Sequence, residues 1–239
     1  MEQQKSGVQH KSDLEKPQVV LFTGGRDSTL TASMLMMRRI PVCLLSADSG
    51  ASLHRSVTHY RVDELRRKFG TELLLDHVTL DVSGTFRSIA LQNIETDILT
   101  DKKNLVVVGE SLAILAHTVN FCLRNKYDTV NCGYTKYQEE FPEQRDSSIV
   151  FSKEFLQKYN IKLECPIYEE AKTIEYVKYR LLEIGLSNKP LEGSTLFSDT
   201  FSVADNSTIL NYMKRKESLT HEHIDFLTQN IFTRELECV

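Results

Sequence analysis

Residues 22–29 read Phe22-Thr23-Gly24-Gly25-Arg26-Asp27-Ser28-Thr29 and follow directly on the apolar run Val19-Val20-Leu21. This order predicts a short buried strand, a turn with two glycines, and a helix that begins with hydroxyl-bearing residues. Glycine lets the backbone adopt positive φ and approach a ligand closely. Successive N–H groups can then point into one concavity, to which the helix N-terminus adds its dipole. The stretch therefore predicts a phosphate-binding turn and a nucleotide-using enzyme.

The side chains of this turn fit the same ligand. The hydroxyls of Thr23, Ser28 and Thr29 can donate hydrogen bonds to phosphate oxygens, and Asp27 can cap the helix or help to organise Mg²⁺. The Walker A frame Gly-x-x-x-x-Gly-Lys is absent, and so is the three-glycine dinucleotide fingerprint. The competing interpretation is a plain strand-to-helix turn with a good cap. The hydroxyl before the glycines and the Asp-Ser pair after them favour phosphate binding.

Composition narrows the class of protein. The chain has 239 residues, a formal net charge of −4 and 41% hydrophobic residues, which predicts one globular domain and argues against global disorder. The charge also argues against a general nucleic-acid surface. No apolar run approaches the ~20 residues that span a bilayer, and the polar start of the chain lacks the apolar core of a secretory signal. We therefore expect a cytoplasmic protein without a membrane segment.

Apolar runs alternate with segments of helical period along the chain. Strands are expected at 19–22, 41–47, 72–78, 105–108 and 129–132, with a short extended piece at 161–165. Helices are expected at 28–39, 53–69, 110–126, 147–159 and 174–184, and Gly70 and Gly185 are expected to end two of them. The run Leu105-Val106-Val107-Val108 is typical of a strand that is buried on both faces. The alternation predicts an α/β fold with a doubly wound, mainly parallel five-stranded sheet.

Ligands of such sheets bind at the carboxyl ends of the strands, which directs attention to the turns at 23–28, 48–52, 109–111 and 133–145. The strand and helix pattern covers the expected domain at 17–186. Residues 1–16 are expected to be a flexible lead-in. Residues 187–239 are expected to be a loop and helical extension, with helices near 207–217 and 220–234.

The cysteines and histidines do not indicate a metal site. The five cysteines are scattered at positions 43, 122, 132, 165 and 238, without the spacing of a zinc knuckle and without a Cys-x-x-Cys redox pair. Four of them lie in apolar surroundings, where cysteine packs as a small hydrophobe. His221 and His223 are two residues apart and share a helix face poorly.

The segment from Thr23 to Ser28 resembles the Ser-Gly-Gly-x-Asp-Ser signature of the PP-loop (N-type) ATP pyrophosphatases, with Thr in place of the first Ser. The resemblance implies an adenine nucleotide alpha hydrolase-like fold. It also implies cleavage of ATP to AMP and pyrophosphate while a carbonyl or carboxylate oxygen is adenylated. The nucleotide-binding residues would then be Thr23, Gly24, Gly25, Arg26, Asp27, Ser28 and Thr29, and the turn would bind pyrophosphate.

Later segments resemble one branch of that superfamily, the 7-cyano-7-deazaguanine synthases. Phe141-Pro142-Glu143-Gln144-Arg145 resembles their Tyr-Pro-Asp-Cys-Arg element, and Val108-Gly109-Glu110-Ser111 resembles their Pro-Gly-Arg-Asn turn. Pro166-Ile167 with Lys172, and Ser49-Gly50 with His54-Arg55, resemble two further elements. The resemblance covers about residues 18–185, and only the first motif is specific alone.

The synthases adenylate 7-carboxy-7-deazaguanine for attack by ammonia. The resemblance implies that Asp27, Ser28, Lys172 and Arg145 are catalytic. Lys172 would neutralise phosphate charge and Arg145 would clamp a carboxylate or phosphate. Asp48 and Gly109 would contact the nucleotide, and Mg²⁺ would bridge its phosphates. The alternative for Arg145 and Lys172 is that both are ordinary solvated charges.

The chain departs from the synthases on the acceptor side. The region 194–206 lacks their four zinc-binding cysteines, so zinc is not expected. Glu110-Ser111 reverses the charge of the Arg-Asn turn, and residues 134–138 replace an acidic substrate-contacting stretch. We therefore expect a rebuilt acceptor pocket that takes a related acid and ammonia, another amine or a protein acceptor. A homodimer is compatible with the resemblance.

Two other functions stay open at this point. The chain could be a non-catalytic nucleotide-binding partner subunit. A tRNA-thiolating member of the superfamily is less favoured, because such enzymes usually need a reactive cysteine pair or an iron–sulfur cluster and a basic RNA-binding appendage. Neither is visible in the sequence.

Overall fold

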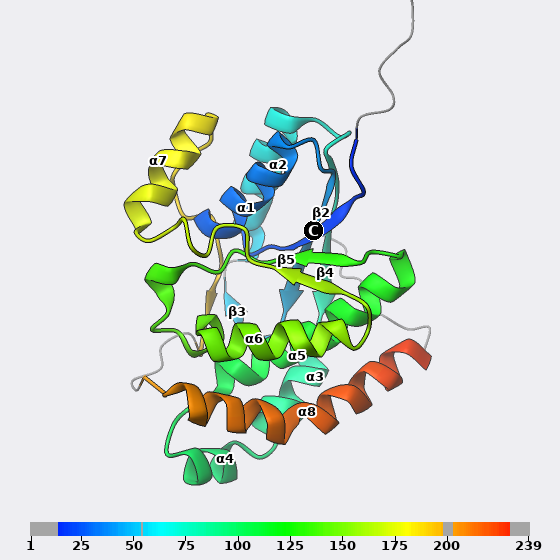
Figure 1. The fold of residues 1–239 in the computed structure, drawn as a ribbon, viewed down its shortest axis with the longest axis vertical. Coiled ribbons are helices and arrows are strands. Elements are labelled where there is room, and N and C mark those ends of the chain that lie inside the picture. The colour runs from blue at the N-terminus through cyan, green and yellow to red at the C-terminus, as the bar shows by residue number, and fades with distance from the viewer. Residues whose placement is uncertain (1–13, 54, 198–202, 230–239) are drawn as a thin grey trace, which may run out of the picture.

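A computed structural model describes residues 14–53, 55–197 and 203–229 (Figure 1). Its centre is a five-stranded sheet in the order β4-β2-β1-β5-β6, in which every pairing is parallel. The strands are β1 (Gln18–Leu21), β2 (Val42–Asp48), β4 (Leu74–Asp81), β5 (Thr129–Asn131) and β6 (Lys162–Glu164). The expected α/β fold with a doubly wound parallel sheet is confirmed. A short antiparallel ladder joins β3 (Ser52–Leu53) to β7 (Ser194–Thr195).

Helices cover both faces of the sheet (Figure 1). One face carries α1 (Arg26–Met37), α2 (Thr58–Phe69) and α7 (Ile174–Ile184), and the other carries α5 (Val106–Asn125), α6 (Asp146–Gln157) and α8 (Asn206–Gln229). Successive residues of a strand point to opposite faces. Val19 accordingly belongs to the core under α5 and α6, and Val20 to the core under α1 and α7.

The ends of several helices follow from their capping residues. Gly70 ends α2 at φ +75° and Gly185 ends α7 at φ +84°, as the sequence predicted. The hydroxyl of Thr173 accepts a hydrogen bond from the Tyr176 N–H at 3.2 Å and caps the start of α7.

The strand expected at 105–108 is wrong, because these residues form the beginning of α5. Leu105 is the N-cap residue, and the Asn104 Oδ1 accepts a hydrogen bond from the Val106 N–H at 3.1 Å. The valines are buried there on nearly every side, so their pattern does not distinguish a buried helix from a buried strand. The short extended piece expected at 161–165 supplies the fifth strand as β6.

The helix α5 is also long and apolar enough to span a bilayer by length and composition, contrary to the expectation that no run would be. However, 78% of its apolar window is buried inside the fold. Such burial is typical of the core helix of a globular domain.

The end of the described chain is one helix, α8, where two were expected. It packs against α5 and α6, and its continuity through residues 218–219 places Ile209, Met213 and Ile224 on one buried face, which also contains the polar residues Lys216 and Thr220. The remainder of the second expected helix, 230–234, and most of the expected lead-in, 1–13, lie outside the described residues. The sequence pattern also left α3 (Ser83–Phe86), η2 (Arg87–Leu91) and α4 (Ile94–Asp101) unassigned.

Candidate functional site

A cleft of about 1060 Å³ lies at the carboxyl ends of the strands. It straddles β1, where the chain order reverses between β2 on one side and β5 on the other. Three groups of residues line it. The turn group comprises Thr23, Gly25, Asp27, Ser28, Thr58 and Glu192. The β2/β4 wall includes Leu45, Ser46, Ala47, His59, His77 and Thr79. The β5/β6 wall includes Val107, Glu110, Ser111, Cys132, Tyr134, Glu143 and Leu163.

The glycine turn has the geometry of an anion-binding loop. Gly24 adopts φ +81°, which an L side chain would strain. The Thr23 and Ser28 hydroxyl oxygens lie 3.3 Å apart, and the Gly25 N–H donates to Thr23 Oγ1 at 3.1 Å. Because α1 begins at Arg26, the N–H groups of its first turn have no partner inside the helix. The turn thus presents two hydroxyls and several backbone donors at one point.

Gly133, directly after β5, holds the turn from the other side. A Cβ atom at this position would lie 2.5 Å from the Ser28 nitrogen. Only glycine lets the backbone beyond β5 pack so closely on the start of α1. The first turn of α1 is therefore fixed against two strands of the sheet.

Asp27 is held by Tyr137, whose hydroxyl lies 2.8 Å from Oδ1 and 2.9 Å from Oδ2. Burial raises the pKa of Asp27 to about 6, although the Tyr137 hydrogen bond acts in the opposite direction. The carboxylate is therefore ionised at neutral pH but poorly solvated. A cation that accompanies phosphate would stabilise it.

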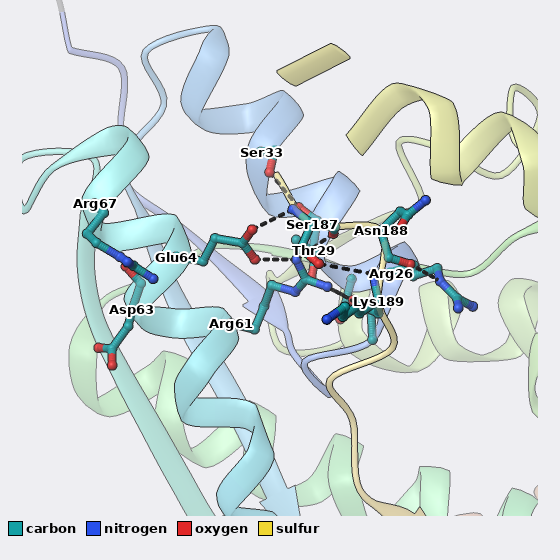
Figure 2. Close-up of polar contacts among 12 residues, drawn as sticks. Arg26, Thr29, Ser33, Arg61, Asp63, Glu64, Arg67, Ser187, Asn188 and Lys189 are labelled. Carbon is teal, nitrogen blue, oxygen red and sulfur yellow. Dashed lines mark hydrogen bonds and ion pairs between the residues drawn. The ribbon is translucent and has the colours of Figure 1, made fainter. Parts of the chain in front are cut away.

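Residues 187–193, which we call the strap, cross the mouth of the glycine turn. Figure 2 shows the polar contacts that hold its first residues, Ser187, Asn188 and Lys189. Arg61 on α2 is fully buried and donates to the carbonyl oxygens of Ser187, at 2.8 Å, and Lys189. Glu64 pairs with Arg61 and accepts the Ser187 N–H. These contacts fasten the strap to α2.

A further bond fastens the strap to α1, because the Arg26 Nε–H donates to the Asn188 carbonyl at 2.7 Å (Figure 2). Leu191 and Glu192 consequently lie over the glycines. A Cβ on Gly24 would meet the Leu191 carbonyl oxygen at 2.2 Å, and a Cβ on Gly25 would meet Glu192 Oε2 at 2.1 Å. Glycine at position 24 is thus required by the strap backbone as well as by the turn, whereas at position 25 the obstacle is the end of the flexible Glu192 side chain.

The Glu192 carboxylate lies against the same donors that would bind a phosphate. Its Oε2 is 3.4 Å from Thr23 Oγ1. Partial desolvation raises the pKa of Glu192, and the Thr23 hydroxyl, Arg26 and Arg61 act in the opposite direction. The chain therefore presents its own anion to the turn.

The β2/β4 wall is largely uncharged. The Ser46 hydroxyl donates to the Phe22 carbonyl at 2.6 Å, so the contact of 2.8 Å between Ser46 Oγ and His77 Nε2 places a proton on that nitrogen. Burial lowers the pKa of His77 to about 4, which keeps the ring neutral at pH 7. The rings of Phe22 and His59 each approach His77 edge-on, with centroids 6.0 and 6.1 Å away.

The β5/β6 wall contains a cysteine pair that the sequence spacing did not reveal. Cys132 follows β5 and Cys165 follows β6, and parallel pairing brings their sulfur atoms within 3.3 Å. The contact between the two thiols lowers the pKa of Cys165, while burial raises that of Cys132. Both cysteines pack in or against the hydrophobic core, as expected, but the sequence did not indicate that they contact each other.

The cleft brings together four of the residues predicted from the sequence, Thr23, Gly25, Asp27 and Ser28. Gly24 forms the turn beside them. Thr29 and Arg26 point elsewhere: the Thr29 hydroxyl donates to the Gly25 carbonyl at 2.6 Å, and Arg26 binds the strap. These two residues support the turn and do not line the cleft.

The other predicted positions lie outside the residues that line the cleft. Asp48 ends β2 and accepts the Gly50 N–H at 2.9 Å, and Lys172 is exposed near the start of α7. Gly109 lies inside α5, where a Cβ would come within 2.6 Å of Ala90 and Tyr212, so helix packing explains this glycine. Arg145 follows the cleft residue Gln144, and its buried Nε has no hydrogen-bond partner in the described chain. The functional roles of these four residues stay predictions.

Sequence reasoning missed the strap and its clamp. Arg61 stands at a core-facing position of α2, one residue before buried Val62 and four before buried Leu65. A charged residue at such a position is the signal that could have suggested a buried polar partner. The acceptors are backbone carbonyls 126 and 128 residues away, which no side-chain pattern marks.

No family model matches this chain, and no curated protein matches it. Among solved structures, the chain is similar to a 4-thiouridine synthetase in complex with RNA and bound ATP, at 12% identity and a TM-score of 0.55, over 92% of this chain and 55% of that one. It therefore spans about half the length of that protein. A predicted subunit of a tRNA methyltransferase from Methanocaldococcus jannaschii gives 17% identity and a TM-score of 0.44, over 73% of this chain and 90% of that one. The first likeness confirms the fold, a parallel α/β sheet of the adenine nucleotide alpha hydrolase-like kind.

Proposed function

We propose that this chain is an enzyme of the PP-loop ATP pyrophosphatase type, which uses ATP and releases AMP and pyrophosphate. The observation that carries the proposal is the turn from Thr23 to Ser28. It combines a positive-φ glycine, two converging hydroxyls and the open N-terminus of α1 at the carboxyl edge of a parallel sheet. That Glu192 lies against the turn supports its affinity for anions.

The two walls of the cleft suggest how ATP lies in it. The pyrophosphate moiety would bind the turn, and Asp27 with the Ser28 hydroxyl offers oxygen ligands to Mg²⁺, which would neutralise phosphate charge. The neutral, partly aromatic β2/β4 wall around His77 suits an adenine base. The α-phosphate would then face the β5/β6 wall.

We infer that the second substrate is a carboxylic acid related to 7-carboxy-7-deazaguanine. One oxygen of its carboxylate would attack the α-phosphorus, the bond from that phosphorus to the bridging oxygen would break, and pyrophosphate would leave. An amine would then form a C–N bond to the acyl carbon as AMP departs. The unpartnered Nε of Arg145, beside the cleft, supports its proposed role as a carboxylate clamp. A cytoplasmic location and a homodimer stay predictions from the sequence.

Product analysis with α-labelled ATP tests this proposal. Incubation with 7-carboxy-7-deazaguanine and ammonium, or a primary amine, is expected to yield AMP and pyrophosphate in equal amounts. The double variant D27A/S28A should lose this turnover, whereas Asp63→Ala, an exposed change on α2, should retain it. Turnover that survives in D27A/S28A contradicts the proposal. Tight ATP binding without pyrophosphate release would favour the non-catalytic nucleotide-binding subunit.

A second candidate function is ATP-dependent sulfur transfer to an activated carbonyl, as in tRNA thiolation. The specific observation in its favour is the contact of 3.3 Å between Cys132 and Cys165, because Cys132 lines the cleft. Transfer of labelled sulfur to RNA that requires both cysteines, but not buried Cys43, would establish this candidate. Absence of transfer by the wild type would exclude it, and undiminished transfer in C132S and C165S would exclude a role for the two cysteines.

A further inference from the structure

Two carboxylates stand on the β5/β6 wall of the cleft without a described role. Glu110 belongs to the first turns of α5, and Glu143 belongs to the short helix η4 (Pro142–Gln144), which packs against α5. Both residues line the cleft, and burial raises the pKa of each carboxyl group. The wall therefore presents a pair of acids to the substrate space.

Glu143 is the less satisfied member of the pair. Its Oε2 is buried and has no hydrogen-bond partner within the described ranges. Burial raises its pKa to about 7, and the nearby charge of Glu110 adds to the effect. Burial also raises the pKa of Glu110, although a hydrogen bond with the Ser49 side chain opposes that shift.

Among the described residues, no cationic side chain acts on the pKa of either acid, because burial, hydrogen bonds and the charge of Glu110 account for both shifts. Their neighbours on the wall are the Tyr134 phenol, which is hydrogen-bonded to Ser111, and the Cys132 thiol. Across the described part of the chain, no salt bridge includes either Glu110 or Glu143. Desolvated carboxylates that lack a cationic partner are costly to the fold. A cationic ligand that enters the cleft would remove this cost.

We propose that Glu110 and Glu143 form the binding site for the ammonium group of an amine substrate, and that they accept its protons as the amide forms. The inference rests on the proposed function and identifies the nucleophile as an amine that binds in its charged form. The presence of Glu110 where the synthases have arginine would not by itself indicate a cationic ligand. The buried Glu143 oxygen beside it is the second, independent observation, because no group in the described chain donates a hydrogen bond to that oxygen.

The two carboxylates accept the two protons that the ammonium group loses as the amide forms. The ammonium group first gives one proton to Glu143, which leaves a neutral amine with a lone pair. The lone pair forms the C–N bond to the acyl carbon, while the C–O bond to AMP breaks and its electron pair leaves with AMP. Glu110 accepts the second proton from the nitrogen. A carboxyl whose pKa lies near neutrality suits such a transfer.

A divalent cation is the competing ligand for two carboxylates. Among the residues described, no group of three or more His, Cys, Asp or Glu side chains could hold a metal ion. The neighbouring phenol and thiol are also poor ligands for Mg²⁺, which prefers charged and carbonyl oxygens. These observations favour the ammonium group.

Carbon-13 NMR of the full chain, labelled at the glutamate side-chain carboxyl carbon, tests the site without ATP or acid. Titration with n-propylamine at neutral pH is expected to shift the Glu143 resonance, whereas the isosteric neutral 1-propanol should not. Amine affinity should fall about tenfold or more in Glu143→Gln and Glu110→Gln, as expected when a charge-assisted hydrogen bond is lost. Glutamine keeps the shape and relieves the buried charge, so these variants are expected to fold.

Glu140→Gln is the matched control, since it removes one exposed carboxylate three residues before Glu143. It should leave amine affinity unchanged. An equal response to 1-propanol, a response to Mg²⁺ but not to the amine, or equal affinity in all variants would overturn the inference. Amine binding without AMP formation would support the site while it contradicts the proposed function. AMP formation without amine binding at this pair would overturn the site alone.

Discussion

Glu192→Gln is expected to strengthen the binding of pyrophosphate. The Glu192 carboxylate lies against the donors of the glycine turn, with Oε2 3.4 Å from Thr23 Oγ1. An incoming anion must displace this side chain and tolerate its charge nearby. Glutamine keeps the size of the side chain and removes the charge, so it competes less for the turn.

The size of the effect follows from the contacts that the carboxylate makes. An anion at a helix N-terminus gains about 0.3–1 kcal/mol, and a hydrogen bond to a charged group contributes about 1.5–3 kcal/mol. The bond to Thr23 is long and the side chain is in contact with solvent, so the lower values apply. A gain of about 1–2 kcal/mol corresponds to binding that is about 5- to 30-fold tighter.

Isothermal titration with pyrophosphate at low ionic strength and pH 8 measures this difference. Glu72→Gln, an exposed change of the same charge before β4, is the control and should match the wild type. Because the pKa of Glu192 is raised, the wild type and the variant should converge as the pH falls and Glu192 becomes protonated. Equal affinities at pH 8, or weaker binding by Glu192→Gln, would refute the idea that this carboxylate competes for the turn.

Three further predictions concern the support of the site. Asp27→Asn should stabilise the ligand-free fold by ~3 kcal/mol above pH 6, measured by urea unfolding, since a carboxylate with its pKa raised from 3.8 to about 6 destabilises the folded state when ionised. The gain should disappear as the pH falls from 6 to 3.8, and a constant difference would contradict this cause. Arg61→Ala should cost about 3–5 kcal/mol of unfolding free energy, because it leaves Glu64 and two strap carbonyls without their buried partner. A loss below about 1 kcal/mol would show that the clamp is unimportant. Oxidised glutathione should link Cys132 to Cys165, which peptide mapping by mass spectrometry can detect, and modification of each cysteine by glutathione alone would contradict their contact.

The first part of the fold could be predicted because several local signals agree there. The buried valines favour a strand, the two glycines favour a turn, and the hydroxyl-rich segment after them favours the start of a helix. Asp27 does not cap that helix as expected, because Gly25 is the N-cap residue and no side chain caps it. The valine run at 105–108 misled the prediction because its residues are buried on every side in either a helix or a strand. Only the capping contact of Asn104 marks the helix start, and its effect on Val106 is visible in three dimensions.

The candidate site could be predicted where its chemistry is contiguous in sequence and not where it depends on packing. Thr23, Asp27 and Ser28 fall within six residues. The Cys132–Cys165 contact depends instead on the register between β5 and β6, and the Glu192 contact depends on a strap held by backbone carbonyls. Neither leaves a local pattern that could be recognised.

Amide NMR during titration with pyrophosphate tests the central claim, that the turn from Thr23 to Ser28 binds the pyrophosphate of ATP. The account predicts that the amide resonances of residues 24–28 shift most and together, that Glu192→Gln enhances the shifts, and that D27A/S28A weakens them. Shifts confined to other parts of the chain, or none at saturating pyrophosphate, would contradict it.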